Sequence, residues 1–151
     1  MGNAITIRSA ELSDASAIAT CLASLGYGTP AALVLQKLTA IAGNSADTVL
    51  LALDPIAGVV GVASLHVLPM FHAAGNLARL TALAVRPDHQ NRGVGRALVT
   101  AAEAFAWKAD CRRIEVTSGN HRPGAHVFYE RLGYHIDERR FIKNGPPAAA
   151  V

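Results

Sequence analysis

The chain has 151 residues, of which 51% are hydrophobic and 17% charged, and it carries a net charge of +3. A chain of this length buries about 70% of its unfolded surface as one domain, and this apolar content excludes wholesale disorder. No apolar run reaches the roughly 18 residues of a membrane span, and no signal-peptide pattern opens the chain. Two cysteines, Cys21 and Cys111, are too few for a disulfide framework or a zinc site, so we expect buried thiols in a cytoplasmic protein without a metal.

The charge is unevenly distributed along the chain. Residues 1–78 carry a net charge of −2, whereas residues 79–151 carry twelve basic against seven acidic side chains, a net charge of +5. A basic second half favours a polyanionic ligand such as a phosphorylated cofactor. Nucleic acid would use the same sign of charge. We expect a cofactor instead, because the sequence shows no basic run and no interleaving of basic with aromatic residues.

The first half of the chain predicts one strand, two helices and a hairpin. Gly26 and Gly43 are expected to end the two helices, and Thr29 and Pro30 are expected to cap and begin the second. The residues Asp54-Pro55-Ile56-Ala57-Gly58 separate two apolar runs and form the turn of the hairpin. The expected elements are a strand at 4–8, helices at 14–25 and 30–42, and strands at 48–53 and 59–68.

The second half predicts strands alternating with helices, which is typical of a parallel pair within a mixed sheet. The expected elements are strands at 76–86 and 113–117, helices at 94–109 and 123–132, a last strand at 134–143 and a flexible tail at 144–151. The order is therefore β-α-α-β-β-β-α-β-α-β. We expect a single domain spanning 1–151, with its core at about 4–143.

The stretch from 80 to 98 reads as a buried strand, a short polar turn and a helix. Pro87 ends the strand, because proline has no ladder donor. Gly93 and Gly95 fall where the helix begins, although glycine is unfavourable inside a helix. Free amides at a helix start bind anions, and glycine lets a phosphate approach them closely. The helix is expected to bury one face, consisting of Val94, Leu98, Ala101 and Phe105.

The flanking residues narrow the kind of phosphate site. A Walker loop would place Lys and Ser or Thr after Gly95, where this chain has Arg96 and Ala97. A dinucleotide fingerprint would place Gly or Ala where this chain has Leu98. The remaining pattern, Gln90-x-x-Gly93-x-Gly95, resembles the coenzyme A motif of the GNAT (GCN5-related) N-acetyltransferases. The structural alternative is a glycine pair that merely opens an ordinary helix.

A second motif strengthens this resemblance. Residues 125–134 are similar to another GNAT signature, A-x-x-x-Y-x-x-x-G-[FY], with Ala125, Tyr129, Gly133 and Tyr134 at its defining positions. The resemblance covers about residues 4–143. It implies an α+β fold of the mixed α/β sandwich type, with roughly six to seven strands in a central mixed sheet flanked by about four helices. It also implies an acetyl-CoA-dependent N-acetyltransferase, in which a primary amine attacks the thioester directly.

The resemblance assigns roles to particular residues. Tyr129 would be the general acid beside the leaving sulfur, although it could instead be a core aromatic beside Phe128. A backbone amide near Val85 would stabilise the oxyanion. The family often has a cofactor-binding asparagine seven residues before the tyrosine. This chain has Arg122 at that position and Asn120 two residues earlier, so either side chain is a candidate contact to the cofactor. The expected cofactor-binding residues are Leu83, Ala84, Val85, Gln90, Asn91, Arg92, Gly93, Val94, Gly95, Arg96, Asn120 and Arg122.

The general base is not evident from the sequence. The central strand offers Arg79 and Thr81, other candidates are His66, His72, Asn120 and His121, and deprotonation through water is the default expectation. The acceptor site would lie around the two first helices, where Tyr27 either contacts substrate or covers the core edge. Aminoglycoside, polyamine, amino-acid and protein amines all stay open as acceptors. The sequence also leaves open a homodimer. Two alternative functions are a non-catalytic acyl-CoA sensor and an RNA-directed enzyme.

Overall fold

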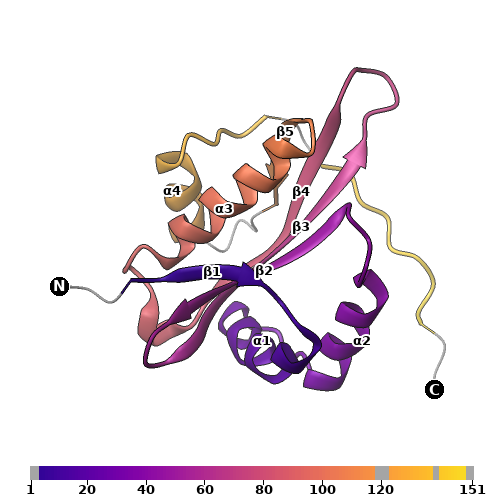
Figure 1. The fold of residues 1–151 in the computed structure, drawn as a ribbon. Helices are drawn as coiled ribbons and strands as arrows, with labels where there is room; N and C mark the ends of the chain where they lie inside the picture. Colours follow the sequence, from indigo (N-terminus) through magenta and orange to yellow (C-terminus); the bar gives the residue numbers. More distant parts are fainter. Residues whose placement is uncertain (1–3, 118–122, 138–139, 149–151) are drawn as a thin grey trace. The chain divides into compact units, whose positions relative to one another are not determined.

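The computed structural model describes residues 4–117, 123–137 and 140–148. The chain divides into two compact units, Met1–Thr117 and Ser118–Val151. The first unit contains a five-stranded sheet and three α-helices, and the second contains one α-helix (Figure 1).

The strands of the sheet lie side by side in the order in which they occur along the chain. β1 (Thr6–Ser9), β2 (Asp47–Asp54), β3 (Gly58–Pro69) and β4 (Asn76–Val85) pair antiparallel, and β5 (Cys111–Val116) pairs parallel to β4. The expected hairpin turn is confirmed, since the Asp54 carboxylate accepts hydrogen bonds from the backbone amides of Ile56 and Ala57. This sheet positions the loop after β4, which is the candidate site.

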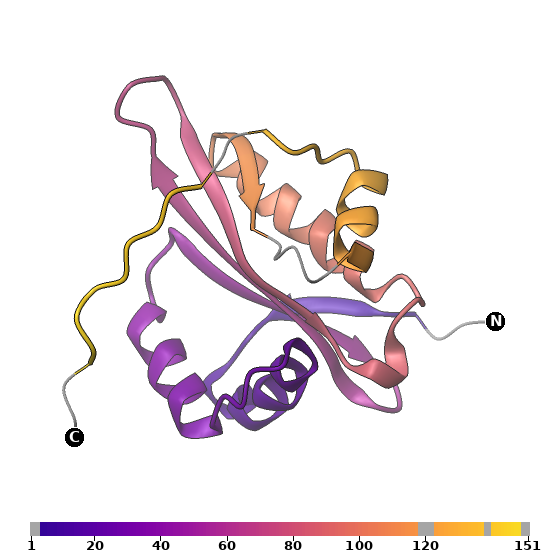
Figure 2. The same ribbon diagram turned by 180° about the vertical axis from the view of Figure 1, so that it is seen from behind.

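Two helices cover one face of the sheet and a third covers the other (Figures 1 and 2). α1 (Ala15–Leu22) and α2 (Ala31–Ile41) bury their apolar side chains against alternate residues of the strands, because side chains on a strand point to opposite faces in turn. α3 (Val94–Lys108) packs on the opposite face, next to Gly61 of β3. The core on the α1 and α2 side consists of Ala15, Ile18, Cys21, Val34, Leu38, Leu51, Val62 and Ala84.

α3 buries a row of residues spaced by four. Val94, Leu98, Ala102 and Ala106 are buried, whereas the expected Ala101 and Phe105 are only half-buried. The small alanines let the helix axis lie close to the sheet, which rotates the buried face toward them. The prediction of this face was therefore correct for the first turns and wrong for the last.

The second unit contains α4 (Pro123–Arg131), which confirms the expected helix. The ring of Tyr129 meets the ring of Phe128 edge-on at 5.1 Å between centroids, and that of Tyr134 at 5.7 Å. Gly133 follows the helix with φ of 92°, which is the left-handed conformation expected of a glycine that ends a helix.

Two sequence expectations need correction. The described residues form five strands, not six or seven, because residues 134–137 and 140–143 are not in a strand. The run Asp137-Glu138-Arg139-Arg140 interrupts the alternation of apolar residues that a half-buried strand requires. Thr29 does not cap α2. The cap is Pro30 in an extended conformation, and its carbonyl accepts the Val34 amide at 3.2 Å.

The two cysteines are buried and free, as expected. Burial raises the pKa of the Cys21 thiol to about 11, and burial also raises that of Cys111. Both thiols are therefore protonated and unreactive near neutral pH.

Candidate functional site

The loop between β4 and α3 folds back on the end of β4. Gln90 donates a hydrogen bond from Nε2 to the carbonyl of Val85 at 3.0 Å, which fixes the loop against the strand from which it leaves. Asn91 has φ of 61°, and Gly93, the N-cap of α3, has φ of 82°. Both residues therefore adopt the left-handed conformation, which turns the chain sharply into the helix.

The start of α3 has backbone donors without an acceptor inside the helix. The first helical hydrogen bond runs from the Ala97 amide to the Gly93 carbonyl at 3.0 Å. The amides of residues 94–96 therefore have no carbonyl within the helix to bond. A methyl group added to Gly93 would meet nothing within 4 Å, so the space beside the N-cap of α3 is open. The exposed Arg92 and Arg96 add positive charge to the helix dipole, and together these groups make a candidate anion site.

β4 has one open edge next to this anion site. Its pairing with β5 ends at Leu80 opposite Val116, so among the described residues positions 81–85 have a strand only on the β3 side. The Arg86 amide bonds the Val60 carbonyl of β3, and in an antiparallel ladder only alternate residues bond to the same neighbour. The backbone groups of Val85 and Leu83 therefore point away from β3, toward the open edge.

Ala84 lies between these two residues, but it contributes to the core and to the pairing with β3 and not to the open edge. Its side chain is buried in the core formed with α1 and α2. The alternation of the ladder directs its backbone groups to β3. Of the three strand residues expected at the site, Leu83 and Val85 are thus the ones whose backbone faces the open edge.

A sequence model with the description "Acetyltransferase (GNAT) family" matches residues 26–134. The chain belongs to the GNAT family. The match includes both motifs, the loop before α3 and the helix that carries Tyr129.

Named relatives agree with this membership. The chain is 30% identical to an aminoglycoside N(6')-acetyltransferase type 1 of Stenotrophomonas maltophilia over 92% of each protein. It is 34% identical to an aminoalkylphosphonate N-acetyltransferase of Salmonella typhimurium over 56% of this chain, and spans only 55% of that relative. The fold is shared with the aminoglycoside N-acetyltransferase AAC(6')-Iy, solved in complex with CoA, at a TM-score of 0.82 and 17% identity, covering 96% of this chain and 97% of that one.

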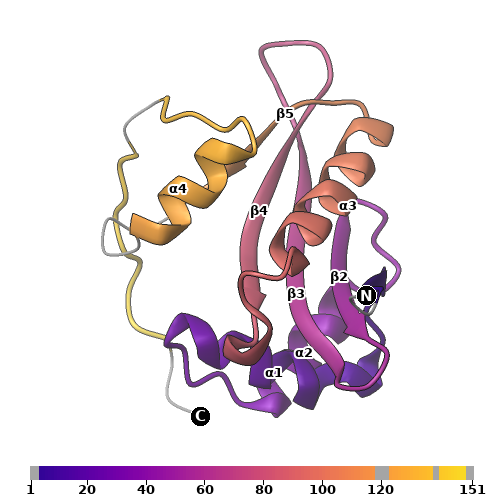
Figure 3. The same cartoon turned by 90° about the vertical axis from the view of Figure 1, so that its left-hand side faces the viewer.

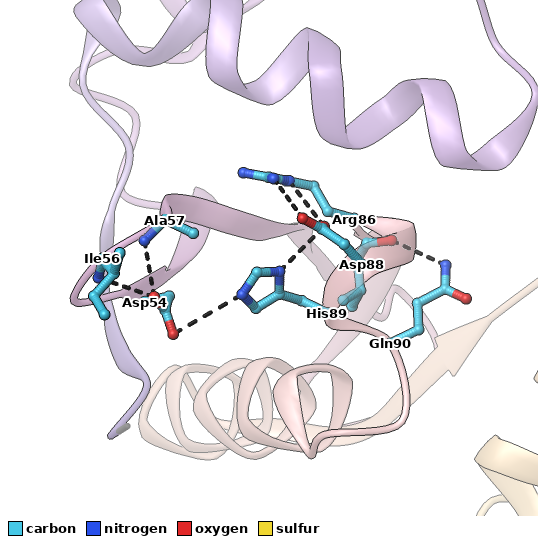
Figure 4. Close-up of polar contacts among 8 residues, drawn as sticks. Asp54, Ile56, Ala57, Arg86, Asp88, His89 and Gln90 are labelled. Carbon is cyan, nitrogen blue, oxygen red and sulfur yellow. Dashed lines mark hydrogen bonds and ion pairs between the residues drawn. The ribbon is translucent and has the colours of Figure 1, made fainter. Parts of the chain in front are cut away.

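The loop between β4 and α3 contains a buried histidine, His89, that contacts other residues of the loop (Figure 4). The His89 amide donates to the Arg86 carbonyl at 2.9 Å, and its ring Nδ1 lies 3.1 Å from Asp88 Oδ1. That approach is poorly aligned for a hydrogen bond. Together with the Arg86 guanidinium, the His89 ring holds the pKa of Asp88 below its ordinary value.

His89 also connects the loop to the β2–β3 hairpin. Its Nε2 lies 3.9 Å from Oδ1 of Asp54, whose Oδ2 accepts the two amides of the hairpin turn. These amides, that of Ala57 first, lower the pKa of Asp54. His89 was not among the predicted site residues, because nothing in the polar turn 86–91 predicts that this side chain is buried.

Tyr129 lies on α4 in the second unit. Burial raises the pKa of its hydroxyl to about 12, so the phenol keeps its proton over the whole neutral range. Such a group can donate a proton or a hydrogen bond, as a general acid must. Asn120, Arg122 and His121 lie outside the described residues.

Other sequence candidates occupy defined places. Arg79 forms an ion pair with Glu115 at 2.8 Å, and His72 is exposed in the β3–β4 connection. A surface cavity of about 470 Å³ lies between the end of α2 and the start of β2, at the opposite end of β2 from Asp54. Within residues 4–117, 123–137 and 140–148 no group of three or more His, Cys, Asp or Glu could hold a metal ion. Over the same residues no helix is long and apolar enough to span a membrane.

Proposed function

We propose that this protein is an acetyl-CoA-dependent N-acetyltransferase, in which a primary amine attacks the thioester directly. The observation that carries the proposal is the combination of an anion site at the start of α3 with the open edge of β4 beside it. The names of the relatives, which are N-acetyltransferases of aminoglycosides and aminoalkylphosphonates, support a small-molecule amine as acceptor.

The open edge has the length that a coenzyme A arm requires. With the pyrophosphate on the amides of residues 94–96 and on Arg92 and Arg96, the pantetheine arm would run back along β4. The arm is about as long as four extended peptide residues, or roughly 14 Å. The edge from Val85 to Thr81 also spans four residue steps, roughly 14 Å in a strand. The amides of the arm can therefore pair with the backbone of Val85 and Leu83, as an added strand would.

The chain can also supply the groups that the reaction needs. Bound acetyl-CoA contributes an activated acetyl thioester. With the arm so placed, the carbonyl of the thioester would fall past Leu83, toward the Thr81 end of the edge, where a backbone N–H can stabilise the developing oxyanion. Tyr129, protonated because of its raised pKa, would give the departing sulfur its proton.

A calorimetric titration with acetyl-CoA tests the proposal, with desulfo-CoA and NADH as comparators. We expect micromolar binding of acetyl-CoA, about −8 kcal/mol, and much weaker binding of NADH. Thiol release is then followed with aminoethylphosphonate, sisomicin and spermidine as amines. Absence of binding to any CoA species would overturn the proposal. Binding without thiol release from any amine would favour the non-catalytic sensor instead.

A further inference from the structure

A chain of hydrogen bonds crosses three strands on the face that α1 and α2 cover. Asp47 of β2 lies 2.7 Å from His66 of β3, measured from Oδ1 to Nδ1. His66 Nε2 lies 2.8 Å from the hydroxyl of Thr81 on β4. The GNAT motifs assign no role to these three residues. The strand register brings them together, since Asp47 is directly opposite His66.

The contacts of Asp47 fix the protonation pattern of the imidazole. A carboxylate only accepts hydrogen bonds, so Nδ1 of His66 carries the proton and Nε2 is left as an acceptor. The second oxygen of Asp47 accepts the Asn44 amide group at 2.8 Å, which holds the carboxylate in place. Nε2 then faces the Thr81 hydroxyl at 2.8 Å and the Ser64 hydroxyl at 3.3 Å. Carboxylate, imidazole and hydroxyl are arranged as in a catalytic triad.

A bulge in β4 directs Thr81 to this position. Ser64 pairs with Ala82 and Leu65 pairs with Leu80, so Thr81 is an extra residue without a partner in the β3 register. Bulges re-aim side chains beside active sites. Thr81 is exposed, and it stands where the pairing of β4 with β5 has just ended. Its hydroxyl contacts His66, and the residue itself stands at the start of the open edge proposed for the thioester.

We propose that Thr81, His66 and Asp47 form a proton relay that deprotonates the acceptor amine, an inference that rests on the proposed function. The ammonium gives a proton to Thr81 Oγ1 as the hydroxyl proton passes to His66 Nε2. Asp47 stabilises the imidazolium, which then releases the proton to solvent, since 29% of the His66 side chain is exposed. A second proton leaves the nitrogen after attack and balances the one that the sulfur takes up.

The charges around the relay are compatible with this role. Arg79 is opposite His66 in the register, and its positive charge would oppose an imidazolium. Its guanidinium is, however, paired with Glu115 of β5 at 2.8 Å, and Asp47 is in direct contact with the ring. The nearest charge to Nδ1 is thus the carboxylate of Asp47.

The test compares matched variants with acetyl-CoA and the three amines named above. His66→Gln and Thr81→Val are expected to lower kcat by about 100-fold or more, with the Kd for acetyl-CoA unchanged. Thr81→Ser, which keeps the hydroxyl, is expected to retain most of the rate. His72→Gln is the control, because this histidine is exposed and outside the relay. Thermal unfolding of each variant separates loss of rate from loss of fold.

The pH profile gives a readout that a structural role would not change. The wild-type kcat should rise with pH and level off once the imidazole is neutral. In His66→Gln it should continue to rise, because only amine that is already deprotonated reacts. If the wild type turns over and His66→Gln keeps the same kcat and profile, the relay is wrong while the proposed function stands. Failure of the wild type to bind acetyl-CoA would overturn both the relay and the proposed function.

Nuclear magnetic resonance of the imidazole nitrogens tests the relay without any amine. The relay requires a proton on Nδ1 of His66 and none on Nε2 in the neutral ring. Asp47→Asn is expected to shift this tautomer balance and to lower kcat. Finding the proton on Nε2 in the wild type would overturn the relay, whichever amine proves to be the substrate.

Discussion

Replacing Gly61 with alanine would add a methyl group beneath the first turns of α3. The new Cβ would lie 2.9 Å from Leu98 Cδ1, 3.0 Å from Val94 Cγ1 and 3.3 Å from the Ala84 carbonyl oxygen. Carbon atoms normally approach to about 3.5–4.0 Å, so α3 must move by roughly 0.5 Å or its side chains must leave their rotamers. Both side chains are fully buried, so neither can turn into open space.

The expected loss of stability follows from this overlap. Overpacking a core costs about 1–3 kcal/mol, and the lower entropy of the unfolded alanine chain offsets about 0.4–1 kcal/mol of it. We therefore expect Gly61→Ala to lower the free energy of unfolding by about 1–2 kcal/mol. For a chain of this length, that lowers Tm by roughly 2–8 °C. Gly28→Ala is the matched control, because its added Cβ would meet nothing within 4 Å and its φ is ordinary.

The same displacement should weaken ligand binding. Val94 is the first residue of α3, so movement of this turn shifts the free amides that would hold the pyrophosphate. We expect the Kd for acetyl-CoA to rise by roughly tenfold, or about 1.4 kcal/mol, in Gly61→Ala and to be unchanged in Gly28→Ala. Denaturant unfolding and calorimetry measure the two effects. Equal stability and equal affinity in the two variants would refute the reasoning that Gly61 sets the height of α3 above the sheet.

Three further changes are informative. Gly93→Asp should abolish acetyl-CoA binding by placing a carboxylate at the anion site, whereas Gly43→Asp, with a similar φ of 79°, should leave binding unchanged. If calorimetry shows the same loss of acetyl-CoA binding in both variants, backbone strain alone explains it. Tyr129→Phe should lower kcat by roughly 10- to 100-fold at constant Kd, and the wild-type rate should not fall from loss of the phenol proton until pH nears about 12. Asp14 accepts two hydrogen bonds from Arg8, which hold its pKa below its ordinary value, so its stabilisation is present above the ordinary pKa and is lost as pH falls through the lowered one. Asp14→Asn should therefore lower the free energy of unfolding by about 1 kcal/mol at neutral pH, allowing for the exposed Arg8. Below about pH 4 the free energy of unfolding of the variant should fall less steeply with pH than that of the wild type, and equal slopes would contradict this.

Much of the fold follows from local sequence patterns. Apolar periodicity predicted the four α-helices and the five strands that the described residues contain, because these patterns reflect which side of each element faces the core. The loop before α3 was also predictable, because glycine readily adopts the left-handed conformation that Gly93 has at the start of the helix. The strand expected at 134–143 failed for the opposite reason. A strand exists only when a neighbour completes its ladder, and the pattern there was interrupted by four charged residues.

The arrangement of functional side chains depended on contacts between distant segments. Asp47, His66 and Thr81 are far apart along the chain, and only the strand register and the bulge in β4 bring them into one row. His89 likewise becomes part of the site because the β2–β3 hairpin places Asp54 beside it. The sequence alone determined the helices, most strands and the loop that opens α3, since each depends on neighbours a few residues away. The open edge of β4 and the polar row across the sheet were decided by tertiary structure, because strand pairing and register join residues that no local spacing relates.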